Sequence, residues 1–399
     1  WSTAGRRMRL TLCRAMGLNG DPRFYRRLVG CLESVDVDPG HGFALRSEAS
    51  IALGRLGLAR AVKPLVRALE TEALEHEGRP GAGMGIQRSV RTHVLAALGE
   101  LQAAPDVLKG YLGNTHGSVL VDPDGRVLYN TDTGNSIMVH DHDGTHVDTM
   151  AGRFPGIHGM QLRIEDGTPY LYAAHLPGKQ AVKLRMDGTH VWTLGVPMES
   201  GHYDDNPDAY NPTAIAVAPD GRIYVADGYG RNWIHVFGPD LKYRSSFGGR
   251  GSEPGQFVTC HGMAIDTSGD EPMLVVCDRE NRRLQRFTLD GKHVDIPVTD
   301  LRRPCGIAFW EGPNGQRVAA IAELEGRVTI LDGDYRVRGH LGDNPDTSQW
   351  SNNGVPPADW KTGVTTAPHG LGFDDAGNIY VQDWNAHGRV HRFTRSTGR

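Results

Sequence analysis

Four histidines share a local context that repeats along the chain. The steps His116-Gly117, His158-Gly159, His261-Gly262 and His369-Gly370 each stand before a short apolar run. Imidazole is the commonest protein ligand for zinc, so histidines gathered by a repeat could hold a metal ion. They could equally pack against a wall and hydrogen-bond a backbone carbonyl, as most single histidines do. The spacing alone leaves both interpretations open.

The His-Gly steps belong to a longer repeated segment, which begins near residue 112 and alternates apolar and polar residues as β-strands do. Its clearest copy is residues 211–240, where short apolar strands are separated by a Pro-Asp-Gly turn and a polar loop. Other copies start at His116, His158, His261, Cys305 and His369. Six copies leave roughly 48 residues each, the size of a four-stranded propeller blade. We therefore predict an all-β fold for residues 112–399, a six-bladed β-propeller.

In a propeller the first strand of every blade lies nearest the central axis, so equivalent residues form a ring around the channel. The ring expected here consists of His116, His158, Pro212, His261, Cys305 and His369. His158, His261 and His369 fall in alternate blades, which suits a three-histidine metal site with a fourth position open to a channel mouth.

The two remaining polar members of the ring have several possible roles. His116 could line the channel, support a metal ligand or act as a general acid. Cys305 could be a small buried residue, a soft metal ligand or a thiol nucleophile. The sequence does not choose between these roles.

Residues 211–287 carry four landmark sequences, NPTAIAV, VADGYGRNWI, PGQFVTCHGMAID and CDRENRRLQRF. These landmarks resemble the peptidyl-α-hydroxyglycine α-amidating lyase family, and the resemblance extends over most of residues 112–399. It implies a propeller of NHL-type repeats that holds zinc through three histidines, which fall at His158, His261 and His369 here. It also implies cleavage of the C–N bond of a peptide ending in α-hydroxyglycine, releasing glyoxylate and a peptide amide. The Asp that ends the second strand of such repeats matches Asp227, Asp278 and Asp383, for which we expect a turn-capping role.

The resemblance also gives roles to two residues outside the ring. Tyr229 matches the phenol that accepts or relays the substrate hydroxyl proton, and Arg279 matches the arginine that holds an anionic group of the substrate. Zinc lowers the pKa of a bound hydroxyl, and a planar guanidinium suits an oxyanion, so the residue types fit the chemistry. Structural roles stay open: Tyr229 as a surface aromatic, and Arg279 as a salt-bridge partner of Asp278 or Glu280.

The chain departs from the family pattern in its first and last blades. A second substrate-binding arginine is replaced by Thr131. The substrate therefore either lacks the carboxylate that this arginine would hold, or is bound by another arginine, the candidates being Arg126, Arg153 and Arg163.

An acidic residue of a structural calcium site is replaced by Gly370, which argues against calcium. A three-histidine site takes iron, copper or nickel as well as zinc, so the metal also stays open.

Residues 1–111 have a different pattern, with Leu and Ala at helical spacing. Three segments, which begin LCRAMGLNG, ALGRLGLAR and VLAALGELQ, each continue past a Gly into a second apolar face. Helix pairs that cannot bury such faces alone stack on one another. We predict an α-helical HEAT-like repeat domain before the propeller, with a surface suited to docking a peptide or a protein partner.

Composition limits the partners and the compartment. The 43 basic and 47 acidic side chains give a net charge of −4 without a Lys/Arg-rich run, so we do not expect nucleic acid as a partner. No run of 18 apolar residues predicts a membrane span, and the first residues lack the apolar stretch of a secretory signal. Five scattered cysteines do not form a disulfide framework, and the family's disulfide positions are unpaired here, with Gly230 at one and Cys277 without a mate. We therefore expect a reducing, cytoplasmic setting.

Three classes of function follow from these observations. The first is a zinc-dependent lyase that cleaves the C–N bond of an α-hydroxylated (carbinolamide) peptide or small molecule. The second is a metal-dependent hydrolase on the same propeller, although lactonase-like propellers favour oxygen-rich calcium sites. The third is a non-catalytic scaffold, in which the propeller and the helical repeats only bind partners.

Overall fold

The computed structural model describes residues 25–32, 49–50, 52–53, 114–133, 135–141, 144–150 and 154–395. The helix α2 (Tyr25–Leu32) lies within the first predicted helix pair. The rest of the predicted HEAT-like repeats falls almost entirely outside the described residues. The helical domain of residues 1–111, its boundary and any docking on it therefore stay predictions.

Within the described residues from 114 to 395 the chain forms six antiparallel sheets, each built from consecutive strands. The first sheet consists of β1 (Thr115–Val121), β2 (Val127–Thr131), β3 (Ile137–His140) and β4 (His146–Met150), and the second of β5 (Ile157–Glu165), β6 (Thr168–His175), β7 (Gln180–Arg185) and β8 (His190–Leu194). The third consists of β9 (Ala214–Val217), β10 (Ile223–Ala226), β11 (Trp233–Phe237) and β12 (Tyr243–Gly248), and the fourth of β13 (Cys260–Asp266), β14 (Met273–Asp278), β15 (Arg283–Thr288) and β16 (His293–Val298). The fifth consists of β17 (Pro304–Glu311), β18 (Arg317–Glu323), β19 (Arg327–Asp332) and β20 (Val337–Leu341), and the sixth of β21 (Pro368–Phe373), β22 (Ile379–Asp383) and β23 (Arg389–Phe393).

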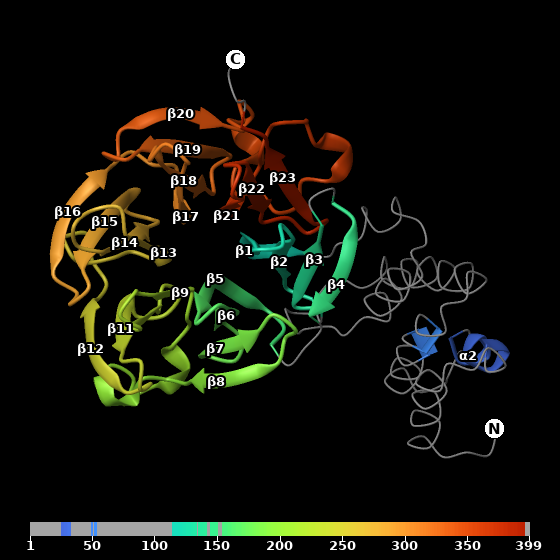
Figure 1. The fold of residues 1–399 in the computed structure, drawn as a ribbon, viewed down its shortest axis with the longest axis horizontal. Helices are drawn as coiled ribbons and strands as arrows, with labels where there is room; N and C mark the ends of the chain where they lie inside the picture. The colour runs from blue at the N-terminus through green and yellow to red at the C-terminus, as the bar shows by residue number, and fades with distance from the viewer. Residues whose placement is uncertain are drawn as a thin grey trace. The chain divides into compact units, whose positions relative to one another are not determined.

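These sheets are the blades of a six-bladed propeller, as the sequence predicted. Figure 1 shows them arranged around one axis, with the first strand of each blade innermost. Short 3₁₀ turns, η3 (Met198–Ser200), η4 (Pro207–Ala209), η5 (Thr347–Gln349) and η6 (Pro357–Asp359), lie in the connections before β9 and β21.

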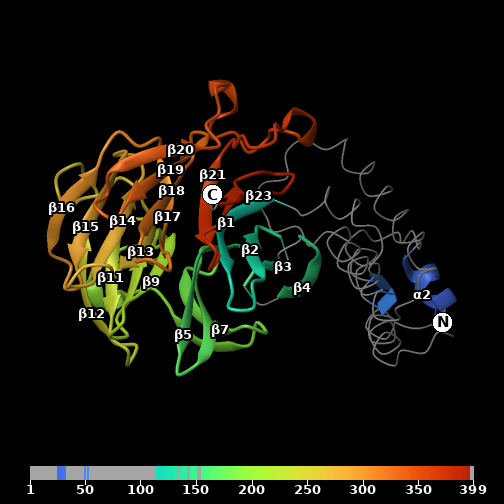
Figure 2. The same ribbon diagram turned by 45° about the horizontal axis from the view of Figure 1, so that its top comes forward.

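The ring of blades closes where the first blade meets the sixth. Thr115 and Asn385 exchange two backbone hydrogen bonds, of 2.9 and 3.0 Å, and the Thr115 hydroxyl donates to the Asp383 carbonyl at 2.7 Å. Strands β1 and β21 lie side by side although some 250 residues separate them (Figure 2). Because the ring is closed, residues on the six inner strands face one shared channel.

Apolar side chains fill the spaces between neighbouring blades. Between the third and fourth blades, for example, buried residues of β9 to β11 such as Tyr224 and Ile234 pack with Leu274 and Phe287 from β14 and β15. Similar clusters lie between the other neighbouring pairs from the first blade to the sixth. The second to fifth sheets are therefore covered on both faces, which holds their inner strands at defined places on the channel wall.

The acidic residue that ends the second strand fixes the entrance of the inner strand. Asp278 accepts a hydrogen bond from the Val258 backbone N–H at 2.9 Å, and Asp383 accepts one from Thr366 N–H at 3.1 Å. These two N–H groups lie three residues before His261 and His369. Asp227 likewise accepts a hydrogen bond from Asn211 N–H, at 2.6 Å. The expected capping role of these aspartates is confirmed, and it also helps to place the ring histidines.

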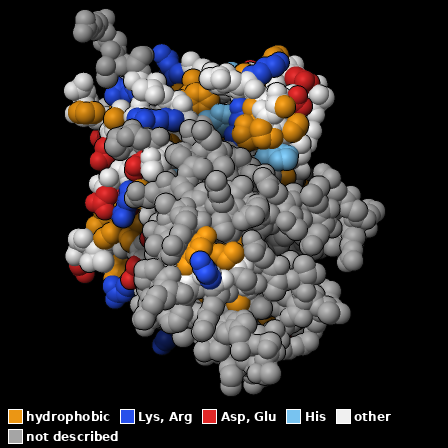
Figure 3. All heavy atoms as spheres, turned by 90° about the vertical axis from the view of Figure 1, so that its right-hand side faces the viewer, with side chains coloured by type: hydrophobic (Ala, Val, Ile, Leu, Met, Phe, Trp, Pro, Cys, Tyr) orange, Lys and Arg blue, Asp and Glu red, His pale blue; other side chains and the backbone are white. Residues whose placement is uncertain are grey.

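Acidic and basic side chains intermingle over the described part of the face shown in Figure 3. Within the described residues, no helix has the length and apolar character needed to cross a membrane.

Candidate functional site

Three imidazoles converge on the channel axis. His158, His261 and His369 are each the second residue of an inner strand, β5, β13 and β21, and their side chains are only 2–3% exposed. Their ring centroids are 4.8, 4.9 and 4.6 Å apart, a nearly equilateral triangle. The predicted alternate-blade histidines are thus neighbours in space, although each group of possible ligand atoms within 4.8 Å of one another holds only two of them, His158 with His369 and His261 with His369.

Each of these imidazoles is oriented by a carbonyl of the following blade. The Nδ1 atoms lie 2.7 Å from the Thr213 oxygen for His158, 2.7 Å from Cys305 for His261 and 3.0 Å from Gly117 for His369. A carbonyl can only accept, so each Nδ1 carries the proton and each Nε2 keeps its lone pair. The same arrangement orients histidine ligands in metal sites.

The Nε2 atoms of His158 and His369 are buried without a hydrogen-bond partner. A buried polar atom in this state is costly, and a cation that accepts both lone pairs would remove the cost. Burial is the largest cause that holds the pKa of all three histidines well below 6.5. The neutral form that binds metals is therefore favoured, and the donor set fits a borderline divalent metal such as zinc.

The glycine after each of these histidines allows the orienting carbonyl to approach. A Cβ atom on Gly159, Gly262 or Gly370 would lie less than 3.0 Å from that same carbonyl oxygen, on Thr213, Cys305 and Gly117 in turn. Any other residue would push the neighbouring strand away. This explains the recurrence of His-Gly: the histidine supplies the donor and the glycine gives access to the acceptor. At Gly370, a carboxylate of the calcium-binding kind would meet the same obstacle.

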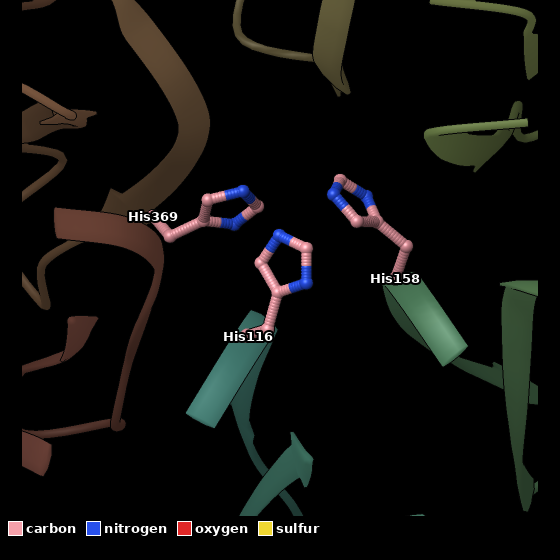
Figure 4. A group of neighbouring side chains, drawn as sticks. All are labelled: His116, His158 and His369. Atoms are coloured by element: carbon pink, nitrogen blue, oxygen red, sulfur yellow. The ribbon is translucent and has the colours of Figure 1, made fainter. Parts of the chain in front are cut away.

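Two further members of the predicted ring lie beside the three histidines. The possible ligand atoms of His116, His158 and His369 lie within 4.8 Å of one another, and so do those of His261, Cys305 and His369. Figure 4 shows the first group, with the rings pointing toward one another from three blades. His116 differs from the others because its Nδ1 pairs with Asp132 at 3.2 Å instead of with a carbonyl, and its side chain is 17% exposed.

The ring has one member that sequence reasoning misplaced. In the third blade the channel wall is formed by Thr213 and not by the expected Pro212. Thr213 supplies the carbonyl that orients His158, and its hydroxyl donates to the Cys260 carbonyl at 2.8 Å. Proline lacks an N–H and cannot donate to the neighbouring strand, whereas the Thr213 N–H donates to the Ala226 carbonyl. Pairing with β10 therefore begins at Thr213, one residue later than the sequence repeat predicted.

Tyr229 and Arg279 meet at His261. The Tyr229 hydroxyl lies 2.9 Å from His261 Nε2, and Arg279 Nη1 donates to the Tyr229 oxygen at 3.1 Å. Burial raises the pKa of the Tyr229 phenol, although the positive charge of Arg279 opposes the rise. Tyr229 is therefore not a surface aromatic. Arg279 forms the salt bridge to Glu280, at 2.9 Å, and also contacts Tyr229.

Arg303 also belongs to this group, and sequence reasoning missed it. Its guanidinium binds both oxygens of Glu280, at 2.7 and 3.0 Å, and its charge, like that of Arg279, opposes the burial-driven rise in the pKa of Tyr229. The available signal was its position two residues before Cys305 in RRPCG.

Thr131 stands where the lyase family has a substrate-binding arginine, and Arg126, Arg153 and Arg163 were the candidates to take over its role. The structure places none of the three at the site. Arg126 pairs with Asp122 and Asp124 in the turn after β1. Arg163 donates to the carbonyls of Val217 and Pro219 near the far end of the inner strands. Arg153 lies outside the described residues. Thr131 is fully buried, with its hydroxyl 2.7 Å from that of Thr133.

A cavity of about 330 Å³ occupies the channel and is lined by the six inner strands. Its wall runs from His158, His261 and His369 toward the carboxyl ends of the strands, among Gly, Ala, Met and Leu residues. Arg279 follows Asp278, which pairs with Cys260 at the opposite, amino end of β13. The three imidazoles therefore lie between this cavity, whose wall also includes Ser118 and Gln161, and a polar mouth that holds Tyr229 and Arg279.

The comparisons with known proteins agree with this architecture. The family model of the NHL repeat matches residues 210–237. A Caenorhabditis elegans protein named a probable peptidyl-alpha-hydroxyglycine alpha-amidating lyase is 33% identical over 139 residues, which cover 34% of this chain. The match spans 37% of that relative's length.

Among solved structures, a streptogramin B lyase matches with a TM-score of 0.49 and 15% identity, over 70% of this chain and 94% of its own. A gluconolactonase from Xanthomonas campestris matches with a TM-score of 0.49 and 14% identity, over 73% of this chain and 94% of its own. At this identity the likeness concerns the fold alone, which the order of the strands already shows.

Proposed function

We propose that this protein is a metal-dependent lyase, which cleaves the bond between nitrogen and a hydroxylated carbon in a peptide or small-molecule substrate. The observation that carries the proposal is the convergence of three buried imidazoles whose Nδ1 atoms are all held by carbonyls. Structural histidines need no common point, whereas a metal site requires one. The partial likeness to a lyase of this class supports the same reaction.

We assign zinc as the metal and His158, His261 and His369 as its ligands through Nε2. A divalent cation held there would act as a Lewis acid on the substrate hydroxyl and lower its pKa. The remaining steps depend on side chains at the polar mouth of the channel.

Tyr229 is suited to move the proton of the substrate. Its oxygen lies at the ring, 2.9 Å from His261 Nε2, and Arg279 stabilises negative charge on it from 3.1 Å. In the proposed reaction the neutral Tyr229 phenol relays one proton: its oxygen accepts the proton of the substrate hydroxyl as it gives up its own, the C–O bond becomes a carbonyl, and the C–N bond breaks. The departing nitrogen receives the proton that the phenol gives up, so Tyr229 ends neutral and the products are a carbonyl compound and an amide.

Arg279 would also hold an anionic group of the substrate. Its side chain is 12% exposed, and its bonds to Tyr229 and Glu280 use only two of its five N–H groups. Burial of the guanidinium strengthens its attraction for an anion because little water screens the charge.

The test is elemental analysis of the purified protein, together with glyoxylate release from a peptide ending in α-hydroxyglycine. We expect about one zinc per chain and glyoxylate release that disappears in His261→Ala. His175→Ala is the matched control: His175 is also buried, but it bonds to the Pro155 carbonyl and belongs to neither group of possible ligand atoms.

The outcomes separate the three classes of function. Metal without glyoxylate release would retain the metal site and point to another hydroxylated substrate or to a hydrolase. A protein that binds no metal and loses no function in His261→Ala would be a binding scaffold, and the lyase proposal would be wrong.

A further inference from the structure

Cys305 is the sulfur-containing member of the histidine ring. It is the second residue of β17, the same place that the three histidines occupy in their strands, and it is 2% exposed. Its Sγ atom and the ligand nitrogens of His261 and His369 all lie within 4.8 Å of one another. The fifth blade stands between the fourth and the sixth, so the thiol enters the ring between these two imidazoles (Figure 1).

The backbone of Cys305 fixes this position. Its carbonyl accepts the Nδ1–H of His261 at 2.7 Å, so the residue that orients one imidazole also carries the thiol. Cys305 therefore cannot move along the channel without disturbing His261.

The guanidinium of Arg279 approaches the Cys305 thiol on one side. On the other side Cys305 packs with Leu324 and Ala367, and Trp384 closes this small apolar cluster. His369, within the 4.8 Å group, has a buried Nε2 without a partner. A cation at this point would satisfy that nitrogen and the sulfur together.

We propose that Cys305 is a ligand of the metal, which it binds as a thiolate together with the histidine nitrogens. This inference rests on the metal site of the proposed function and adds a sulfur donor to it. On metal binding the S–H bond breaks, a metal–sulfur bond forms, and one proton leaves to solvent for each ion bound.

A thiolate would change what the site selects. Nitrogen donors alone accept most divalent transition metals, whereas a sulfur donor favours zinc, cadmium and cobalt over hard cations such as magnesium and manganese. Three nitrogens and one sulfur would also complete a tetrahedral shell. A substrate oxygen would then have to enter as a fifth ligand or displace the sulfur.

X-ray absorption of the zinc-loaded wild-type protein tests the proposal without any variant. We expect a sulfur scatterer at about 2.3 Å in addition to nitrogen at about 2.0 Å. A shell of nitrogen and oxygen alone would overturn the proposal.

Cobalt loading tests the identity of the sulfur. The Co²⁺ protein should show a thiolate-to-cobalt charge-transfer band, which disappears in Cys305→Ser and persists in Cys277→Ser. Cys277 is the matched control, because it is an equally buried cysteine on β14 that shares no ligand group with the histidines. Persistence of the band in Cys305→Ser would contradict the proposal, and circular dichroism would show whether that variant is folded.

The result also distinguishes this inference from the function on which it rests. A protein that binds metal through nitrogen only and releases glyoxylate would leave the proposed lyase standing and remove Cys305 from its ligands. A protein that takes up no metal at all would remove both.

Discussion

The His-Gly step can be tested by adding one methyl group. In Gly262→Ala the new Cβ would lie less than 3.0 Å from the Cys305 oxygen, the acceptor for His261 Nδ1. Gly262 does not have a left-handed φ, so alanine is allowed by the backbone and the effect comes from contact with the next blade.

The size of the effect follows from the distances. To reach an ordinary van der Waals separation, β13 and β17 would have to part by about 1 Å. The Nδ1–oxygen distance of 2.7 Å would then exceed the range of a hydrogen bond. Loss of such an orienting partner typically weakens metal binding about 10- to 100-fold, and overpacking costs roughly 1–3 kcal/mol of stability.

The assay is competition for zinc with a chelator of known affinity, at a temperature where the variant is folded. Gly306→Ala is the control: its Cβ would lie 3.1 Å from the His369 oxygen, and that carbonyl is not the acceptor for any of the three ring histidines described above. We expect the control to bind zinc within a few-fold of wild type. Equal zinc affinity in Gly262→Ala and wild type would refute the explanation of the His-Gly repeat.

Three further perturbations have defined outcomes. Tyr229→Phe should keep its metal and lower kcat about 10²- to 10⁴-fold, since it removes only the hydroxyl at His261 and Arg279; an unchanged kcat would exclude Tyr229 from proton transfer. Burial lowers the pKa of His235 to about 3, so the folded state binds fewer protons than the unfolded state below pH 6.5. The metal-free protein should therefore lose up to about 2 kcal/mol between pH 6.5 and 5 through this residue, and denaturant titrations should show a smaller loss in His235→Gln. Asp383→Ala leaves Arg389 and His391 without their buried partner and should cost about 3–5 kcal/mol of unfolding free energy; a change under 1 kcal/mol in thermal or denaturant unfolding would contradict the capping role.

The sequence by itself determined the architecture and the choice of ring histidines. Alternating strands and Asp-Gly turns at a regular interval specify blades, because each blade is a local unit whose strands pair with their neighbours in the chain. Once the number of blades is known, equivalence along the repeat places His158, His261 and His369 in alternate blades. The helical pattern of residues 1–111 gives a prediction of the same kind, which the described residues leave open.

The details of the site depended on contacts between blades, which no local pattern contains. The pairing of each Nδ1 with the next blade's carbonyl, the approach of Thr213 in place of Pro212, and the meeting of Arg279 with Tyr229 join residues that are 44 to 252 positions apart. A side chain such as Arg303 looks like any surface arginine until Glu280 is brought against it. These arrangements exist only after the ring of blades has closed, because closure fixes the distance between neighbouring inner strands.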